Sequence, residues 1–209
     1  RNAVDYTIKY IEEAELEMSD NVKALLLIEV DGNQPEPLMD EIQKVLEVVE
    51  AHNSDDNILF AEDKAQKEKL WFIRRRIGEA VKVNSIYKEE DTVVPRYKLP
   101  ELLSGVKEIG KKYGFESICY GHAGDGNLHV NIIKGDLTQK QWDNELPLAI
   151  REIFQLTVSL GGTISGEHGI GWVQKDYMDI AYQGIELNLM REIKKVFDPK
   201  NIMNPSKIF

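Results

Sequence analysis

Apolar residues recur along the chain in two patterns, one with helical spacing and one of short continuous runs. The helical pattern and its capping residues predict helices over residues 5–16, 37–52, 63–77, 100–114, 138–161 and 185–197. The short runs predict strands over residues 23–30, 58–60, 92–94, 116–120 and 128–133. The helix that begins at Thr138 is predicted to be the longest.

The order of these elements favours one fold class. Strands and helices alternate, but the strands 116–120 and 128–133 are separated by only a short turn. Such a turn joins antiparallel strands, because parallel strands need a long crossover. We therefore predict an α+β fold with a mostly antiparallel sheet covered by helices on one face, and the repeated strand–helix–strand order predicts a ferredoxin-like core.

The turn between those two strands carries histidines. Residues 120–131 read Tyr-Gly-His-Ala-Gly-Asp-Gly-Asn-Leu-His-Val-Asn. A four-residue loop over 124–127 would place His122 opposite His129, with Cβ atoms about 5 Å apart. Strand alternation places Asn131 on the same face. Two imidazoles beside an amide indicate a metal half-site, and the alternative is a tight turn with two surface histidines.

A second stretch, residues 161–171, reads Gly-Gly-Thr-Ile-Ser-Gly-Glu-His-Gly-Ile-Gly. Its glycines fit a close backbone approach, but it lacks the sequence of a nucleotide phosphate loop. Glu167 and His168 offer a third metal ligand and a general base side by side; a plain glycine-rich loop with a surface Glu–His pair is the alternative. Two histidines and one carboxylate leave coordination positions open for substrate, as in catalytic Zn²⁺, Mn²⁺ or Fe²⁺ sites. Zn²⁺ would act there as a Lewis acid.

Three consecutive arginines, residues 74–76, lie in the predicted helix 63–77. Neighbouring helical residues are about 100° apart, so the three cannot all face one ligand. Arg74 shares a face with Trp71 and Gly78, and a partly buried arginine there would suit a carboxylate bound in bidentate fashion. The alternative is a solvated arginine on an amphipathic helix.

Composition excludes several classes of function. The 209 residues carry a formal net charge of −10, which argues against a nucleic-acid partner. The longest apolar run, residues 24–28, is far below the roughly 20 residues of a transmembrane segment. The single cysteine, Cys119, is expected to be an inert core thiol in a reducing compartment. We therefore expect a cytoplasmic protein that reaches a membrane only through partners, and the start at Arg1 without Met or signal region predicts a part of a longer protein.

In chain order, the hairpin, the glycine-rich stretch and residues 198–207 (Asp-Pro-Lys-Asn-Ile-Met-Asn-Pro-Ser-Lys) resemble the C-terminal domain of FAD-linked oxidases. This is the family of the glycolate oxidase flavin subunit, D-lactate dehydrogenase and D-2-hydroxyglutarate dehydrogenase. The resemblance runs almost end to end. It implies that residues 1–209 form one C-terminal substrate or cap domain, and that an N-terminal FAD-binding domain would precede Arg1.

The resemblance also implies a role for each candidate residue. The family's divalent metal ligands, usually to zinc, are matched by His122, His129 and Glu167. The catalytic base is matched by His168, and the substrate contacts by Asn131 and by Arg74, which would hold the carboxylate. The segment that returns towards the flavin is matched by Asn204. Glu89 stands where the 2-hydroxyglutarate branch has a substrate-binding lysine, so this acidic stretch is more like the glycolate and lactate branch.

The implied function is oxidation of a small D-2-hydroxy acid, of the glycolate or D-lactate type, to the 2-oxo acid with hydride transfer to FAD. The expected cofactors are FAD, bound mainly by the missing domain, and a divalent metal, expected to be Zn²⁺. The expected partners are the substrate, the protein's own N-terminal FAD domain and further electron-transfer subunits. This chain alone is expected to be inactive. Two alternatives from other classes are a metal-dependent hydrolase that uses the same His-His-Glu site and a non-catalytic interaction domain that kept the fold.

Overall fold

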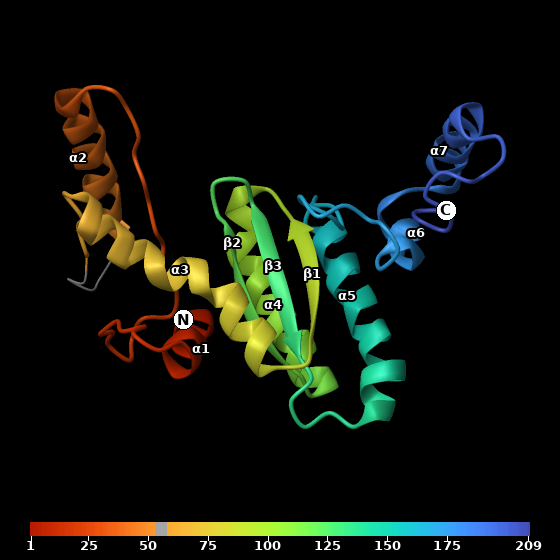
Figure 1. Cartoon of the computed structure of the whole chain (residues 1–209), viewed down its shortest axis with the longest axis horizontal. Coiled ribbons are helices and arrows are strands. Elements are labelled where there is room, and N and C mark those ends of the chain that lie inside the picture. The colour runs from red at the N-terminus through yellow and green to blue at the C-terminus, as the bar shows by residue number, and fades with distance from the viewer. Residues whose placement is uncertain (53–57) are drawn as a thin grey trace. The chain divides into compact units, whose positions relative to one another are not determined.

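The computed structural model describes residues 1–52 and 58–209, and its contacts divide the chain into two compact units (Figure 1). The first holds Arg1 and Ala3–Ala80, and the second holds Asn2 and Val81–Phe209. Each unit is described by itself.

The first unit contains helices joined by irregular segments. They are α1 (Asn2–Tyr10), α2 (Pro35–His52) and α3 (Lys64–Asn84), whose last turn belongs to the second unit. Asp63 caps α3 as predicted, because its carboxylate accepts the Gln66 N–H at 2.8 Å. Helix α1 ends at Tyr10 rather than at the predicted residue 16.

The two strands predicted in this unit are absent from its described residues. Residues 23–30 and 58–60 are irregular, and Leu26 and Leu59 are 68% and 59% exposed. A strand is stable only where a neighbouring strand satisfies its backbone hydrogen-bonding groups, and an apolar run says nothing about such a partner. The prediction of strands in these two segments was wrong.

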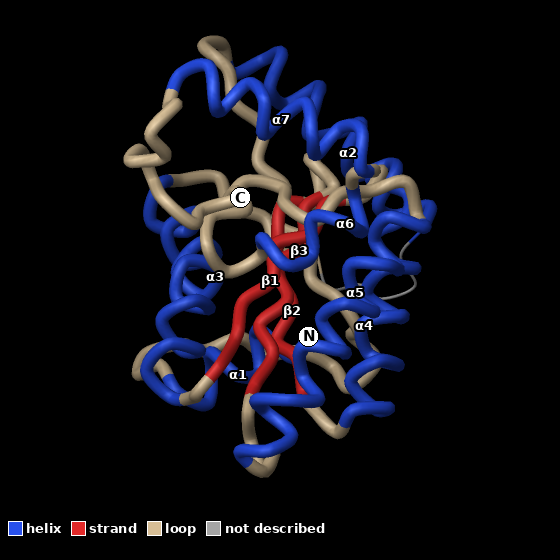
Figure 2. Tube along the Cα trace, turned by 90° about the vertical axis from the view of Figure 1, so that its right-hand side faces the viewer, coloured by secondary structure: helices blue, strands red, loops and turns tan. Residues whose placement is uncertain are grey.

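The second unit is built on an antiparallel sheet. The described residues of this unit form three strands, β1 (Tyr87–Val93), β2 (Glu116–His122) and β3 (Asn127–Ile133), in the order β1-β3-β2. Helix α4 (Leu99–Tyr113) connects β1 to β2, and α5 (Leu146–Ser159) follows β3. Both helices cover the same face of the sheet, as Figure 2 shows. The predicted α+β class with helices on one face is confirmed.

The strand order is that of a ferredoxin-like core without its fourth strand. In such a core the fourth strand would lie beside β1. At that edge the described residues form one isolated bridge, in which Thr163 and Val93 exchange N–H···O bonds of 3.0 and 3.3 Å. The glycine-rich stretch therefore runs along the edge of β1.

The hydrophobic core of this unit lies between the sheet and the helices α4 and α5. Alternate residues of β3 face the helices, and Val130 and Ile132 are fully buried there together with Leu102 of α4 and Phe154 of α5. Burial of each such side chain stabilises the fold by roughly 1.5–3 kcal/mol. The residues of β3 that alternate with them, His129 and Asn131, therefore face the opposite side of the sheet.

The chain begins α5 through the predicted capping box. The Thr138 N–H donates to Gln141 Oε1 at 3.0 Å, and the Gln141 N–H donates to Thr138 Oγ1 at 3.3 Å. A π-helical turn, Gln141–Glu145, then leads into α5. Among the described helices α3, with 21 residues, is the longest, so the length predicted for the helix at Thr138 was wrong.

The C-terminal part of the unit is helical. It contains the short helices Lys175–Tyr177 and α6 (Met178–Ala181), followed by α7 (Gly184–Phe197), which begins with a Gln183–Glu186 capping box. Throughout the residues that the structure describes, no helix combines the length and the apolar character that a membrane crossing requires.

Candidate metal and active site

The β2–β3 hairpin turns one residue earlier than predicted. Its loop is residues 123–126, so Tyr120 pairs with His129, and His122 pairs with Asn127. Gly126 takes the last loop position with φ 75°, and a Cβ there would lie 1.9 Å from the Val94 carbonyl oxygen. The prediction of His122 directly opposite His129 was therefore wrong. Both histidines still lie on one face of the sheet. Moving the loop by one residue shifts the pairing of the strands by two residues, and alternate residues of a strand share a face.

Three potential metal ligands meet on this face. His129 Nε2 lies 3.1 Å from Glu167 Oε1, and His122 Nε2 lies 3.9 Å from the same oxygen. One donor atom of each residue falls within 4.8 Å of the others. Donors bound tetrahedrally at about 2.0–2.2 Å from a cation are separated by about 3.3–3.6 Å. The separations of 3.1 and 3.9 Å from Glu167 Oε1 lie close to this range, so the His-His-Glu set can hold a divalent cation.

The three potential ligands differ in burial, and this difference suits metal binding. His129 is buried, whereas the side chains of His122 and Glu167 are about half exposed, at 50% and 52%. Burial lowers the pKa of His129, although the nearby carboxylates of Asp91 and Glu89 oppose that shift. A neutral imidazole has the lone pair that a metal ligand needs. The exposed side of the set leaves room for a further ligand.

His168 and Asn131 are on the same face. The His168 ring stacks on the His129 ring, with centroids 5.0 Å apart and planes 20° apart. Its Nε2 lies 3.9 Å from Glu167 Oε1. Asn131 is buried beside His129 on β3, and its Nδ2 donates to the Ile118 carbonyl at 3.3 Å. The structure thus places a potential base and an amide beside the potential metal ligands.

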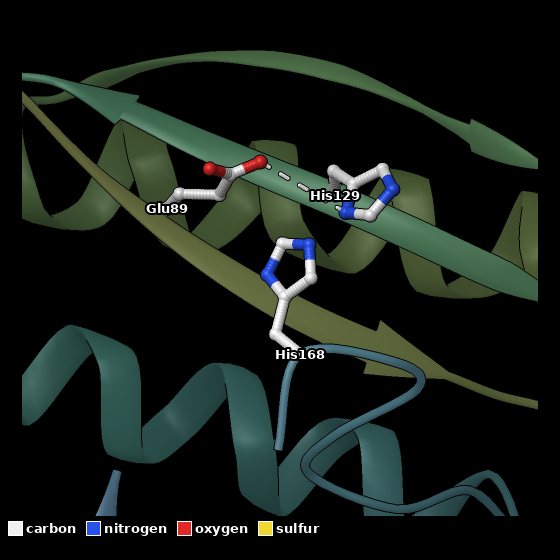
Figure 3. Close-up of side chains that lie close together, drawn as sticks. All are labelled: Glu89, His129 and His168. Atoms are coloured by element: carbon white, nitrogen blue, oxygen red, sulfur yellow. Dashed lines mark ion pairs between the residues drawn. The ribbon is translucent and has the colours of Figure 1, made fainter. Parts of the chain in front are cut away.

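A second group of donors uses the other side of His129. Figure 3 shows Glu89 on β1, His129 on β3 and His168 on the glycine-rich stretch converging from three elements. Glu89 Oε1 lies 3.9 Å from His129 Nδ1. The first group has the shorter contact, at 3.1 Å, so we take Nε2 as the ligand atom of His129. The carboxylates on the Nδ1 side, of Glu89 at 3.9 Å and Asp91 at 3.8 Å, lie beyond hydrogen-bonding distance, but their charges favour a proton on that nitrogen.

Asp91 is a residue of this site that the sequence interpretation missed. It is fully buried on β1 and accepts backbone N–H groups from Gly166, Glu167 and His168. Burial raises its pKa, but these donors and the Asn127 amide outweigh that effect and lower it. A signal was present in the sequence: three consecutive acids, residues 89–91, precede an apolar run, and acids are disfavoured in strands unless they have partners.

Arg74 and Asn204 are the other two predicted site residues. Arg74 is on α3 in the first unit. Asn204 is exposed in the segment after α7, with φ 46°, and its carbonyl accepts the Lys207 N–H at 3.3 Å. This segment is joined to the glycine-rich stretch through the Ile208 N–H, which donates to the Gly171 carbonyl at 2.8 Å. The roles of Arg74 and Asn204 stay predictions.

The fold and the donor set define the class: an α+β domain with a His-His-Glu constellation on the open face of its sheet. The family model described as "FAD linked oxidases, C-terminal domain" matches residues 3–208. The chain belongs to this family. The predicted resemblance is confirmed, and the comparisons give the hydrolase alternative no support.

Several curated relatives are similar over most of the chain. A D-lactate dehydrogenase of Anaerostipes hadrus is 34% identical over 96% of this chain and 42% of its own length. Glycolate oxidase subunit GlcD of Bacillus subtilis is 30% identical over 97% of this chain and 43% of its own length. A D-2-hydroxyglutarate dehydrogenase of Stutzerimonas stutzeri is 35% identical over 72% of this chain and 33% of its own length. The chain thus spans less than half the length of these relatives.

A solved structure shares the fold. The chain of 4-ethylphenol oxidase from Gulosibacter chungangensis, in its isoeugenol complex, matches with a TM-score of 0.51 and 13% identity. The match covers 83% of this chain and 37% of that one. At this identity the likeness concerns the fold alone.

Proposed function

We propose that residues 1–209 are the substrate- and metal-binding part of a flavoprotein that oxidises a small D-2-hydroxy acid to the 2-oxo acid. The observation that carries the proposal is the His122, His129 and Glu167 set, at metal-binding separations, with His168 stacked beside it. The names of the relatives, D-lactate dehydrogenase and glycolate oxidase subunit, support the substrate class. An FAD-binding domain of the same protein is the proposed partner.

The residues of this chain divide the work between binding and proton transfer. His122, His129 and Glu167 would hold a divalent cation, proposed to be Zn²⁺, which when bound supplies a Lewis acid for the substrate oxygens. FAD, held by the partner domain, would supply the hydride acceptor. His168 Nε2 would take up the proton of the substrate hydroxyl, and Asn131 would contact the substrate. The family resemblance assigns the substrate carboxylate to Arg74 of the first unit.

The acidic residue Glu89 favours monocarboxylate substrates. Its carboxylate lies on the site face, 3.9 Å from His129 Nδ1. The second carboxylate of a dicarboxylic hydroxy acid would be repelled there, whereas glycolate and D-lactate carry none. We therefore propose a substrate of the glycolate or D-lactate type.

Metal analysis of the complete protein that contains this chain tests the site. We expect about one equivalent of zinc, lost from His122→Ala and from His129→Ala. His52→Ala is the matched control, because His52 lies in the last turn of α2 and belongs to the first unit. Equal zinc in all four proteins, or none in any, would contradict the metal assignment. Turnover of glycolate and D-lactate above that of D-2-hydroxyglutarate would support the substrate class, and the reverse order would exclude it.

A further inference from the structure

The glycine-rich stretch is organised around one carboxylate oxygen. Oδ2 of Asp91 accepts the N–H groups of Gly166, Glu167 and His168 at 2.9, 2.7 and 2.8 Å. It also accepts the Ser165 hydroxyl at 3.3 Å. Consecutive N–H groups that converge on one point form an anion-binding nest. In this protein the anion is a side chain from β1, which fixes the backbone that carries the potential ligand Glu167 and the potential base His168.

The other oxygen of Asp91 faces the hairpin. Oδ1 accepts Asn127 Nδ2 at 2.6 Å and lies 3.8 Å from His129 Nδ1. That nitrogen is buried and has no hydrogen-bond partner among the described residues. An Nδ1–H directed at Asp91 and Glu89 leaves the lone pair of His129 on Nε2, the atom that faces Glu167.

We propose that Asp91 is the positioning residue of this site. Its carboxylate joins the backbone of residues 166–168 to the His129 side of the hairpin, and it thereby sets the distance between Glu167 and His129. The inference rests on the proposed function for its effect on metal and catalysis. The arrangement also explains Gly166, because a Cβ there would lie 2.2 Å from Asn127 Nδ2 and would displace the amide from Asp91. Asp91 itself touches neither metal nor substrate in this scheme.

The charge and both oxygens of Asp91 are needed. An asparagine can present its oxygen to the three N–H groups only by turning its own NH₂ group towards the Asn127 amide. Either two donors then meet, or Asn127 rotates its amide and loses the hydrogen bond that its Nδ2 donates to the Thr92 carbonyl at 3.2 Å. Buried N–H groups without an acceptor destabilise the local backbone. Substitution of an outer-shell partner of a metal ligand typically lowers metal affinity by about 10–100-fold. We expect Asp91→Asn in the complete protein to lower zinc affinity within that range.

The test combines two measurements on the complete protein. Hydrogen exchange of the peptide covering residues 165–169 is followed after zinc has been removed, and zinc affinity is measured by competition with a chromophoric chelator. Asp91→Asn should speed exchange of this peptide about tenfold or more and should weaken zinc binding. Adding Asn127→Asp to Asp91→Asn restores a donor–acceptor pair and should recover part of both losses.

Asp198→Asn is the matched control. Asp198 is also a buried carboxylate that accepts backbone N–H groups, from Ile202 at 2.9 Å and Met203 at 3.0 Å, but it lies at the end of α7. This variant should leave zinc affinity and the exchange of residues 165–169 unchanged. An equal effect of both variants would show general destabilisation and would overturn the inference.

The outcomes separate this inference from the proposed function. If the wild type binds zinc and Asp91→Asn binds it equally well, the inference fails and the proposed function stands. If the wild type binds no zinc, the metal assignment within the proposed function fails, and the exchange of residues 165–169 still decides the role of Asp91. If Asp91→Asn does not fold, Ser165→Ala removes one donor to Asp91. Because the Ser165 hydroxyl also accepts the Gly169 N–H at 2.8 Å, exchange is then read at residues 166–168 alone. This variant should speed exchange of these residues by about twofold or more, and unchanged exchange overturns the inference.

Discussion

At the residue scale, the proposed mechanism requires His168 to lie close to the potential metal ligands and to act as a base rather than as a ligand. Its ring stacks on His129, and its Nε2 lies 3.9 Å from Glu167 Oε1. A general base contributes typically 10²–10⁴-fold to a rate. We expect His168→Ala in the complete protein to lower kcat for the preferred hydroxy acid by about that factor while the zinc content stays at the wild-type level.

Steady-state kinetics and metal analysis on the same preparations check this prediction. His52→Ala serves again as the control and should show wild-type kcat and zinc. Turnover by His168→Ala within a fewfold of the wild type would remove His168 from the mechanism. Loss of zinc would instead make it a ligand.

The residues that the sequence revealed are those whose chemistry is visible without neighbours. Histidines in a tight turn and a Glu–His pair among glycines are unusual enough to be noticed, and the structure brings His122, His129, Glu167 and His168 together. Asp91 was not predicted because its hydrogen-bond partners are residues 165–168, which follow it by 74 to 77 positions in the sequence. An acid in a charged run looks solvated until the partner segment is placed.

At the element scale, β1 carries three consecutive acidic residues, 89–91, two of which are buried. Glu89 and Asp91 face the site, whereas Glu90 points to the helix-covered face, opposite Val130, and is only 2% exposed. Its Oε2 accepts Gln174 Nε2 at 3.2 Å. Burial raises the pKa of Glu90 to about 7, and the Gln174 hydrogen bond only partly offsets this.

The raised pKa of Glu90 predicts how stability depends on pH. In the unfolded chain the group titrates near 4.5, so between pH 4.5 and about 7 the folded state holds the proton more tightly. The stabilisation that the protonated Glu90 carboxyl adds to the free energy of unfolding is fully present below pH 4.5 and is lost as the pH rises through about 7. The loss is on the order of 3 kcal/mol. Glu90→Gln stays neutral and should remove it.

Urea denaturation at pH 5 and pH 8 measures this effect in the complete protein. Glu90→Gln should resemble the wild type at pH 5 and be more stable than it at pH 8. Glu116→Gln, on the exposed end of β2, should follow the wild type at both pH values. A stability gain for Glu90→Gln that is equal at pH 5 and pH 8 would show that proton binding is not its cause.

The elements themselves were predictable where local signals agree. Gly114 ends α4 with φ 77°, and the capping box at Thr138 is formed, since both depend only on nearby residues. The strands expected over 23–30 and 58–60 failed because pairing is a long-range property. The predicted hairpin loop was displaced by one residue. In the structure the loop residue Gly126 accepts the Val94 N–H at 3.0 Å, a contact between distant parts of the chain that the local sequence does not reveal.

At the scale of the whole molecule, the proposed metal joins segments that are distant in sequence. His122 and His129 belong to the hairpin, and Glu167 lies on the stretch along the edge of β1. A ligand that binds only the folded state stabilises it by RT ln(1 + [L]/Kd), which is about 2.7 kcal/mol at a concentration of 100 Kd. The unfolded chain, with its ligands separated, binds the cation weakly.

We therefore expect the complete protein to unfold at a higher temperature with zinc than after chelation, with Tm rising as free zinc increases. His129→Ala should abolish this dependence, because it removes the buried ligand, whereas His52→Ala should retain it. Calorimetric scans at several zinc concentrations measure the effect. A Tm that rises equally in His129→Ala would place the stabilising cation elsewhere in the protein, since the remaining His122 and Glu167 side chains are each about half exposed and offer only two ligands.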